Sequence, residues 1–151
     1  MRVHAASSDF EAVHFVEGFV DGVLNGTADY QGTPHHFELR SAEPNRAEIY
    51  RLTPLSPEAF AAVTEAWEIW RRWQQVQRAA ASDASALLAA LPEDRERQAE
   101  LRGFIGNWLA RAAPSAFLAE GDFDQVTSDA GQPSLRVKWS RLEVPVGAFD
   151  H

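Results

Sequence analysis

The chain contains the stretch Phe60-Ala-Ala-Val-Thr-Glu-Ala-Trp67-Glu-Ile-Trp70-Arg-Arg-Trp73, in which three tryptophans recur at three-residue intervals. On an α-helix, these rings and their apolar neighbours cover about 200° of the circumference. A helix that lies on a single surface needs an apolar stripe of only about 100°. The stretch therefore predicts a helix that packs on two sides, one of them against a sheet. Its second side would meet another helix, a partner subunit or a ligand.

The residues around this stretch indicate where the helices begin and end. Ser56 is a good N-cap and Pro57 suits the first helical position, so we predict a helix from there to about Ala81. A short helix is predicted over residues 83–91, and another from Pro92 until Pro114 ends it. The apolar residues of that last helix form a stripe about 140° wide, which we expect to pack beside the tryptophan helix. They are Leu101, Phe104, Ile105, Trp108, Leu109 and Ala112.

Alternating apolar and polar residues predict strands on both sides of the helices. Residues 10–24 are β-like, with apolar residues on both faces, and residues 18–30 and 35–40 form a predicted antiparallel hairpin. Further strands are predicted over residues 47–52, 117–126 and 135–142. The order β-β-β-α-α-β-β predicts an α+β fold, with an antiparallel sheet of about five strands covered on one face by two main helices. At 16.8 kDa, residues 1–151 are expected to form a single domain.

Charge and composition exclude several classes of function. The net charge is −8, with 22 acidic against 14 basic residues. Such a field opposes nucleic acid and anionic membranes, so neither is an expected partner. The chain has no cysteine, which removes disulfides and thiolate chemistry. It also lacks a signal-peptide pattern and an apolar run of about 18 residues, so we expect a cytoplasmic protein.

A candidate ligand site lies on the predicted strand over residues 35–40. His36 and Glu38 would share one strand face about 7 Å apart, and Asp21 or Asp29 could add a carboxylate from across the hairpin. These groups would form a metal set only if His35 turned to the same side. Strand alternation points His35 the other way, which favours a polar outer face. We therefore predict no metal and no cofactor, and keep Asp21, His35, His36 and Glu38 as candidate pocket residues.

The sequence contains no recognisable catalytic motif. It lacks Gly-x-Ser-x-Gly, Ser-x-x-Lys and His-Glu-x-x-His, which favours a role without catalysis while leaving the question of an enzyme open. Tryptophan and arginine are enriched at protein interfaces. The far end of the tryptophan helix is therefore a candidate interaction edge, formed by Trp70, Arg72, Trp73 and Val76.

Three functions fit these observations. The first is a cytoplasmic protein-interaction module that uses the tryptophan helix to form a homodimer or to bind a protein partner. The second is a small-molecule-binding domain or modest enzyme with a pocket between the sheet and that helix. The third is an acidic inhibitor, such as an immunity-type protein, which would use the charge of −8 directly.

Three segments also carry a family resemblance. Gly32-Thr-Pro-His-His-Phe-Glu38, Tyr50-Arg-Leu-Thr-Pro-Leu55 and Trp67-Glu-Ile-Trp-Arg-Arg-Trp73 resemble a family of uncharacterised small bacterial proteins. The resemblance covers roughly the first half of the chain. It implies a cytoplasmic, single-domain α+β protein, and it identifies no catalytic residue because no activity is known for the family.

Overall fold

The computed structural model describes residues 10–19, 23–41, 48–80, 90–127 and 133–142. These residues belong to two compact units. One unit, residues 1–55 and 113–151, contains all the strands and is called the barrel unit. The other, residues 56–112, contains the two long helices and is called the helical unit. The single-domain organisation of the chain stays a prediction.

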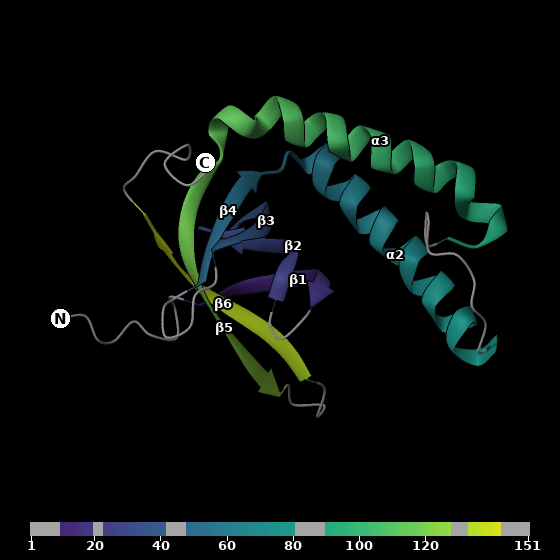
Figure 1. The fold of residues 1–151 in the computed structure, drawn as a ribbon, viewed down its shortest axis with the longest axis horizontal. Coiled ribbons are helices and arrows are strands. Elements are labelled where there is room, and N and C mark those ends of the chain that lie inside the picture. Colours follow the sequence, from purple (N-terminus) through teal and green to yellow (C-terminus); the bar gives the residue numbers. More distant parts are fainter. Residues whose placement is uncertain (1–9, 20–22, 42–47, 81–89, 128–132, 143–151) are drawn as a thin grey trace. The chain divides into compact units, whose positions relative to one another are not determined.

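The strands of the barrel unit close on themselves (Figure 1). Each strand pairs antiparallel with its neighbours in the sequence, and the first also pairs with the last through Phe10 and Lys138. The strands are β1 (Phe10–Phe19), β2 (Val23–Tyr30), β3 (Thr33–Ser41), β4 (Glu48–Pro54), β5 (Phe117–Thr127) and β6 (Pro133–Arg141). The predicted hairpin is confirmed in part: β2 and β3 pair from Asn25–Glu38 to Tyr30–Thr33, but its first strand begins at Val23 and not at Gly18.

The prediction of an open sheet of about five strands, covered on one face by helices, is wrong. Residues 10–24 contain a separate strand, β1, which ends at Phe19 and pairs there with Val23. This sixth strand supplies the edge that meets β6, so none of the six described strands keeps an open edge. Register shifts between Val13 and Phe15 and again after Val16 bend β1 into the closed shape. A closed barrel packs its inner face with its own side chains and needs no helical cover for that purpose.

Four aromatic rings fill the centre of the barrel. The ring centroids of Phe37, Tyr50, Phe123 and Trp139 lie between 5.4 and 5.8 Å apart in all six pairings. A Cβ atom at Gly121 would lie 2.6 Å from the Trp139 ring, so only glycine leaves room for that ring. The interior of this barrel is thus a packed aromatic core.

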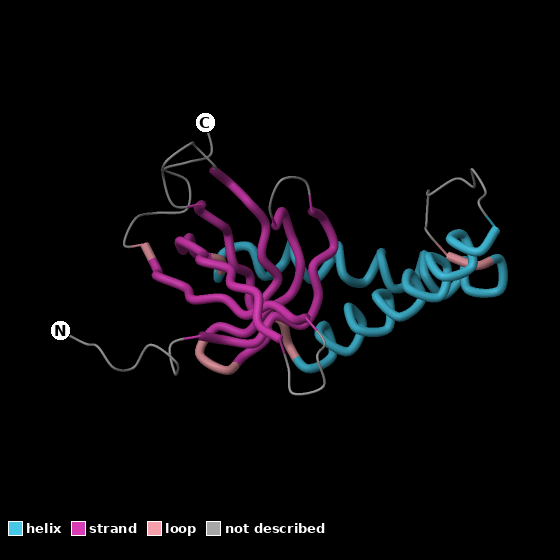
Figure 2. The backbone as a smooth tube through the Cα atoms, turned by 90° about the horizontal axis from the view of Figure 1, so that it is seen from below, coloured by secondary structure: helices cyan, strands magenta, loops and turns pink. Residues whose placement is uncertain are grey.

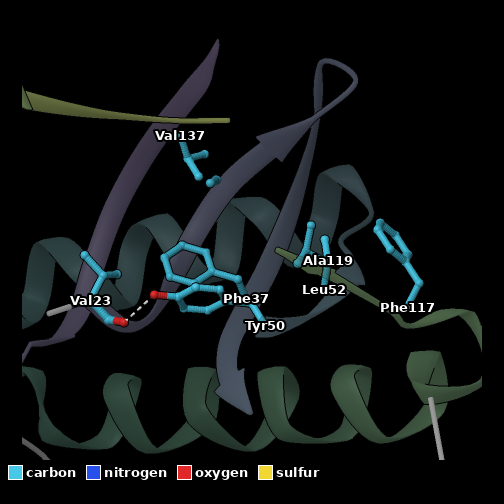
Figure 3. Packing of buried hydrophobic residues seen from close by; sticks show 8 residues of the cluster. Val23, Phe37, Tyr50, Leu52, Phe117, Ala119 and Val137 are labelled. Atoms are coloured by element: carbon cyan, nitrogen blue, oxygen red, sulfur yellow. Dashed lines mark hydrogen bonds between the residues drawn. The ribbon is translucent and has the colours of Figure 1, made fainter. Parts of the chain in front are cut away.

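One buried hydrogen bond crosses this core. The Tyr50 side chain is fully buried on β4, and its hydroxyl lies 2.8 Å from the carbonyl oxygen of Val23 on β2. Figure 3 shows the hydroxyl directed at that carbonyl beside the Phe37 ring. The Glu48 carboxylate lies 3.0 Å from the same hydroxyl, so a single proton is shared between two acceptors.

The helical unit contains α2 (Pro57–Ala80), a 3₁₀ turn η1 (Pro92–Asp94) and α3 (Arg95–Ala112). The predicted cap is confirmed, because the Ser56 hydroxyl accepts a hydrogen bond of 3.0 Å from the Ala59 N–H. The helix predicted over residues 83–91 falls almost entirely outside the described residues. The chain then leaves α3 through a 3₁₀ turn, η2 (Ala113–Ser115), which contains Pro114.

The two long helices lie side by side (Figure 2) and share a small core. This core consists of Ala62, Ala66, Ile69, Ala90 and Leu101, with Ile105 packed against it. Leu101 and Ile105 belong to the stripe that was expected to meet the tryptophan helix, so this part of the prediction is confirmed. In the part of the chain that the structure describes, neither helix is long and apolar enough to cross a membrane.

Candidate functional site

Strand alternation separates the residues predicted to form a pocket on β3. His35 is only 6% exposed and lies between the rings of Tyr30 and Phe117, with centroids 5.5 and 5.7 Å away. Its Nδ1 atom hydrogen-bonds the Thr33 carbonyl oxygen at 2.7 Å. The next residue along the strand, His36, lies on the opposite face.

On that opposite face, Glu38 already has a partner. Its carboxylate accepts a hydrogen bond of 2.9 Å from Arg51 on β4. The fourth candidate, Asp21, lies outside the described residues. The structure therefore does not bring His35, His36 and Glu38 together into one site.

Burial determines the charge of both histidines. Desolvation lowers the pKa of His35, against the hydrogen bond to Thr33 and the charges of Asp29 and Glu11. Desolvation also lowers the pKa of His36, against the charges of Glu17 and Glu38. Both imidazoles are thus neutral at pH 7, the form that binds metals. Even so, the described residues contain no group of three His, Asp or Glu side chains that could hold a metal ion.

A second polar cluster fixes the turn between β2 and β3. Glu11 accepts hydrogen bonds from the backbone N–H groups of Gln31 (2.6 Å) and Gly32 (3.0 Å), whose φ angles of 55° and 80° define a tight hairpin turn. The Asp29 carboxylate hydrogen-bonds His14 Nε2 at 2.7 Å. The contacts of these side chains are with the barrel itself, so the cluster serves the fold.

The predicted interaction edge consists of Trp70, Arg72, Trp73 and Val76. Trp70 stacks on Trp67 with centroids 4.9 Å apart. Arg72 donates two hydrogen bonds, of 3.1 and 3.3 Å, to Asp94, the last residue of η1. Trp73 is half-buried, whereas Val76 is 45% exposed. The edge therefore offers one well-exposed apolar side chain, Val76.

A groove along the seam between α2 and α3 is the more substantial surface feature. It has a volume of about 480 Å³, and each helix lines it with residues at the spacing i, i+3, i+4, i+7. The lining residues are Glu58, Ala61, Ala62 and Glu65 of α2, and Arg97, Glu100, Leu101 and Phe104 of α3.

Small side chains explain why this seam is hollow. Ala61 and Ala62 end at Cβ, so the surface above them is left unfilled, while Leu101 is buried beneath it. Phe104 borders the groove and is 38% exposed. The result is an apolar floor beside an exposed aromatic side chain.

The charged residues of the groove are unbalanced. Arg97 donates hydrogen bonds of 2.7 and 2.8 Å to Glu65 and one of 3.3 Å to Glu100. The hydrogen bonds from Arg97 lower the pKa of the Glu65 carboxyl. Glu58, Glu65 and Glu100 thus oppose one guanidinium, which leaves two carboxylates in excess around the apolar floor.

The groove was not predicted, because Phe104 was expected to pack with the rest of the α3 stripe against the tryptophan helix. That expectation is wrong, since Leu101 and Ile105 face α2 while Phe104 is exposed. A signal was present in the paired alanines, Ala61 and Ala62, within Glu58-Ala-Phe-Ala-Ala-Val-Thr-Glu65. This pattern places two carboxylates and two minimal side chains on one helix face.

Fold and groove together define the class of this protein, a closed six-stranded antiparallel barrel whose chain leaves the sheet between β4 and β5 to form a helical hairpin. No family model, no curated protein and no solved structure matches this chain.

Proposed function

We propose that this chain is a small cytoplasmic protein-interaction module in which the α2–α3 hairpin carries the binding surface. The observation that carries the proposal is the groove of about 480 Å³, with its alanine floor and the 38% exposed Phe104. An apolar centre with a polar, charged rim is the arrangement found in protein interfaces. We also keep the resemblance to a family of small bacterial proteins as part of this proposal. It suggests no activity, because none is known for that family.

Two of the alternatives, a small-molecule site and a homodimer, receive less support from the described residues. A small-molecule site inside the barrel would need space that the rings of Phe37, Tyr50, Phe123 and Trp139 occupy. The candidate pocket residues His35 and His36 lie on opposite faces of β3. A homodimer would bring together two chains of charge −8, which repel each other.

The test is capture of partners on the immobilised full-length chain, with two variants that differ only in position. Ala61→Leu fills the floor of the groove, and leucine maintains the helix. Ala99→Leu makes the same change at an exposed position of α3 that does not line the groove. We expect a protein that is captured from cytosol by the wild type and by Ala99→Leu, and is lost with Ala61→Leu.

Quantitative mass spectrometry of the three eluates measures this difference. Circular dichroism checks that both variants keep the helix content of the wild type. A set of captured proteins that is identical for all three chains would contradict the proposal.

A further inference from the structure

We infer that the groove binds a basic, amphipathic helical segment of the partner, an inference that rests on the interaction role proposed above. The first argument is charge. Glu58, Glu65 and Glu100 surround the groove, and Arg97, the one cation among the described residues that line it, is already engaged by Glu65 and Glu100. A lysine or arginine of a partner would therefore meet carboxylates that Arg97 does not fully neutralise.

The net charge of the whole chain has the same sign, although residues 56–112 contribute little to it, with 8 acidic and 7 basic residues. A net charge of −8 attracts basic partners over distances beyond direct contact and repels acidic ones. A second copy of this chain is disfavoured for the same reason. Complementarity thus selects a basic partner before any contact forms.

The shape of the groove favours a helix as the bound element. The lining residues follow the i, i+3, i+4, i+7 spacing on both α2 and α3, so the groove runs along the seam between two helices. An amphipathic helix presents its apolar anchors at this same spacing. Its anchors would cover Ala61, Leu101 and Phe104, while basic residues at the margins of its apolar face would meet Glu58 and Glu100.

The experiment uses a synthetic peptide of about 18 residues, with leucine at i, i+3, i+4 and i+7 and lysine elsewhere. It is labelled and titrated with the full-length chain, and fluorescence anisotropy reports binding. Two matched peptides replace every lysine with glutamate or with glutamine. We expect the lysine peptide to bind at least about tenfold more tightly than either of them, and to weaken as salt is raised.

Two pairs of variants localise the binding. Glu100→Lys changes a charge in the groove, and Glu68→Lys makes the same change at an exposed position of α2 outside it. We expect Glu100→Lys to weaken the lysine peptide by about tenfold and Glu68→Lys by less than about twofold. Ala61→Leu should weaken binding of this peptide, and Ala99→Leu should not.

The outcomes separate this inference from the proposed function. If all three peptides bind equally and lose affinity with Ala61→Leu, the groove is a protein site of another chemistry, so the inference fails and the function stands. Equal weakening by Glu100→Lys and Glu68→Lys would mean general charge attraction and would overturn the inference. A dimer in sedimentation velocity that dissociates with Ala61→Leu would assign the groove to a second copy and would also overturn it.

Discussion

Replacing Tyr50 with phenylalanine tests whether the hydrogen bond across the barrel stabilises the fold. The change retains the ring, whose centroid lies 5.4 to 5.7 Å from those of Phe37, Phe123 and Trp139. It removes only the hydroxyl that lies 2.8 Å from the Val23 carbonyl. The aromatic packing should therefore survive, and the loss should report the hydroxyl with its two acceptors, the Val23 carbonyl and the Glu48 carboxylate.

The expected cost follows from burial. A net hydrogen bond contributes about 0.5–1.5 kcal/mol, and a buried group left without its partner costs about 1–3 kcal/mol. Tyr50 is 0% exposed, so no water can replace its hydroxyl without a rearrangement. We expect the free energy of unfolding to fall by about 2 kcal/mol and Tm by about 4–8 °C. Truncation to alanine would cost about 3–5 kcal/mol, because it would also leave a cavity.

Urea unfolding followed by far-UV circular dichroism measures the difference, with an unchanged m-value as the sign of a two-state comparison. Tyr30→Phe is the matched control, because no described residue accepts a hydrogen bond from the Tyr30 hydroxyl. Its cost should stay below about 0.5 kcal/mol. A Tyr50→Phe variant as stable as the wild type would refute the assigned role of the hydroxyl.

The same residue predicts a loss of stability at alkaline pH. Burial raises the pKa of Tyr50 above its ordinary value of 10.0, and the hydrogen bond and charge of Glu48 add to the shift. Above that pH the unfolded chain releases this proton while the folded chain retains it, so the free energy of unfolding declines as pH rises. This decline should be shallower in Tyr50→Phe.

Three further predictions concern other positions of the fold, each measured by urea unfolding. Gly121→Ala should destabilise the barrel by about 1–3 kcal/mol, because the new Cβ would lie 2.6 Å from the Trp139 ring; an unchanged midpoint would contradict this. Gln98→Leu should stabilise the helical unit by about 1 kcal/mol, because the fully buried Gln98 Oε1 has no partner among the described residues. A loss of stability would contradict this and would show that the 3.1 Å hydrogen bond from Gln98 Nε2 to the Ala66 carbonyl outweighs the cost of the unpaired oxygen. Because burial lowers the pKa of His35, the unfolded state binds more protons below about pH 6.5, and stability should fall as pH drops. His35→Gln should flatten this slope, and an equally steep slope would contradict the assignment.

Local features of the sequence predicted the elements of this fold but not its closure. The N-cap at Ser56 and the strand over residues 35–40 follow from spacing and periodicity, and both are confirmed. Closure depends on the pairing of Phe10 with Lys138, which lie near opposite ends of the chain. Alternation identifies a strand but says nothing about what its edge meets, so the same pattern fits an open sheet or a barrel.

The candidate site was harder to predict because it depends on the rotation of one helix about its axis. Leu101, Phe104 and Ile105 are all apolar and adjacent on α3. The structure buries Leu101, packs Ile105 against the core and exposes Phe104. A rotation of a few tens of degrees would exchange these roles, and tertiary packing rather than sequence determines it. The tryptophans led to a predicted interaction edge at the far end of α2, whereas the groove lies over Ala61 and Ala62.

The composition of the hairpin core links binding to stability. Ala62, Ala66 and Ala90 make up most of its buried residues, and each alanine contributes little apolar area. The ion pair between Arg97 and Glu65 is exposed to solvent and adds little to the stability of the hairpin. A partner segment that covers the groove binds only the folded hairpin and must raise its stability, by about 2.7 kcal/mol at a hundred times its Kd.

A larger side chain of this protein that fills the groove should also raise the stability of the hairpin, though by less than a bound partner. Ala61→Leu adds apolar surface against Leu101 and Phe104 while keeping a strong helix former in α2. We therefore expect this variant to lose binding and to unfold at a higher urea concentration than the wild type. A substitution that merely damaged the hairpin would lower both the affinity for the partner and the stability. If Ala61→Leu lowers both, the assignment of the groove is contradicted.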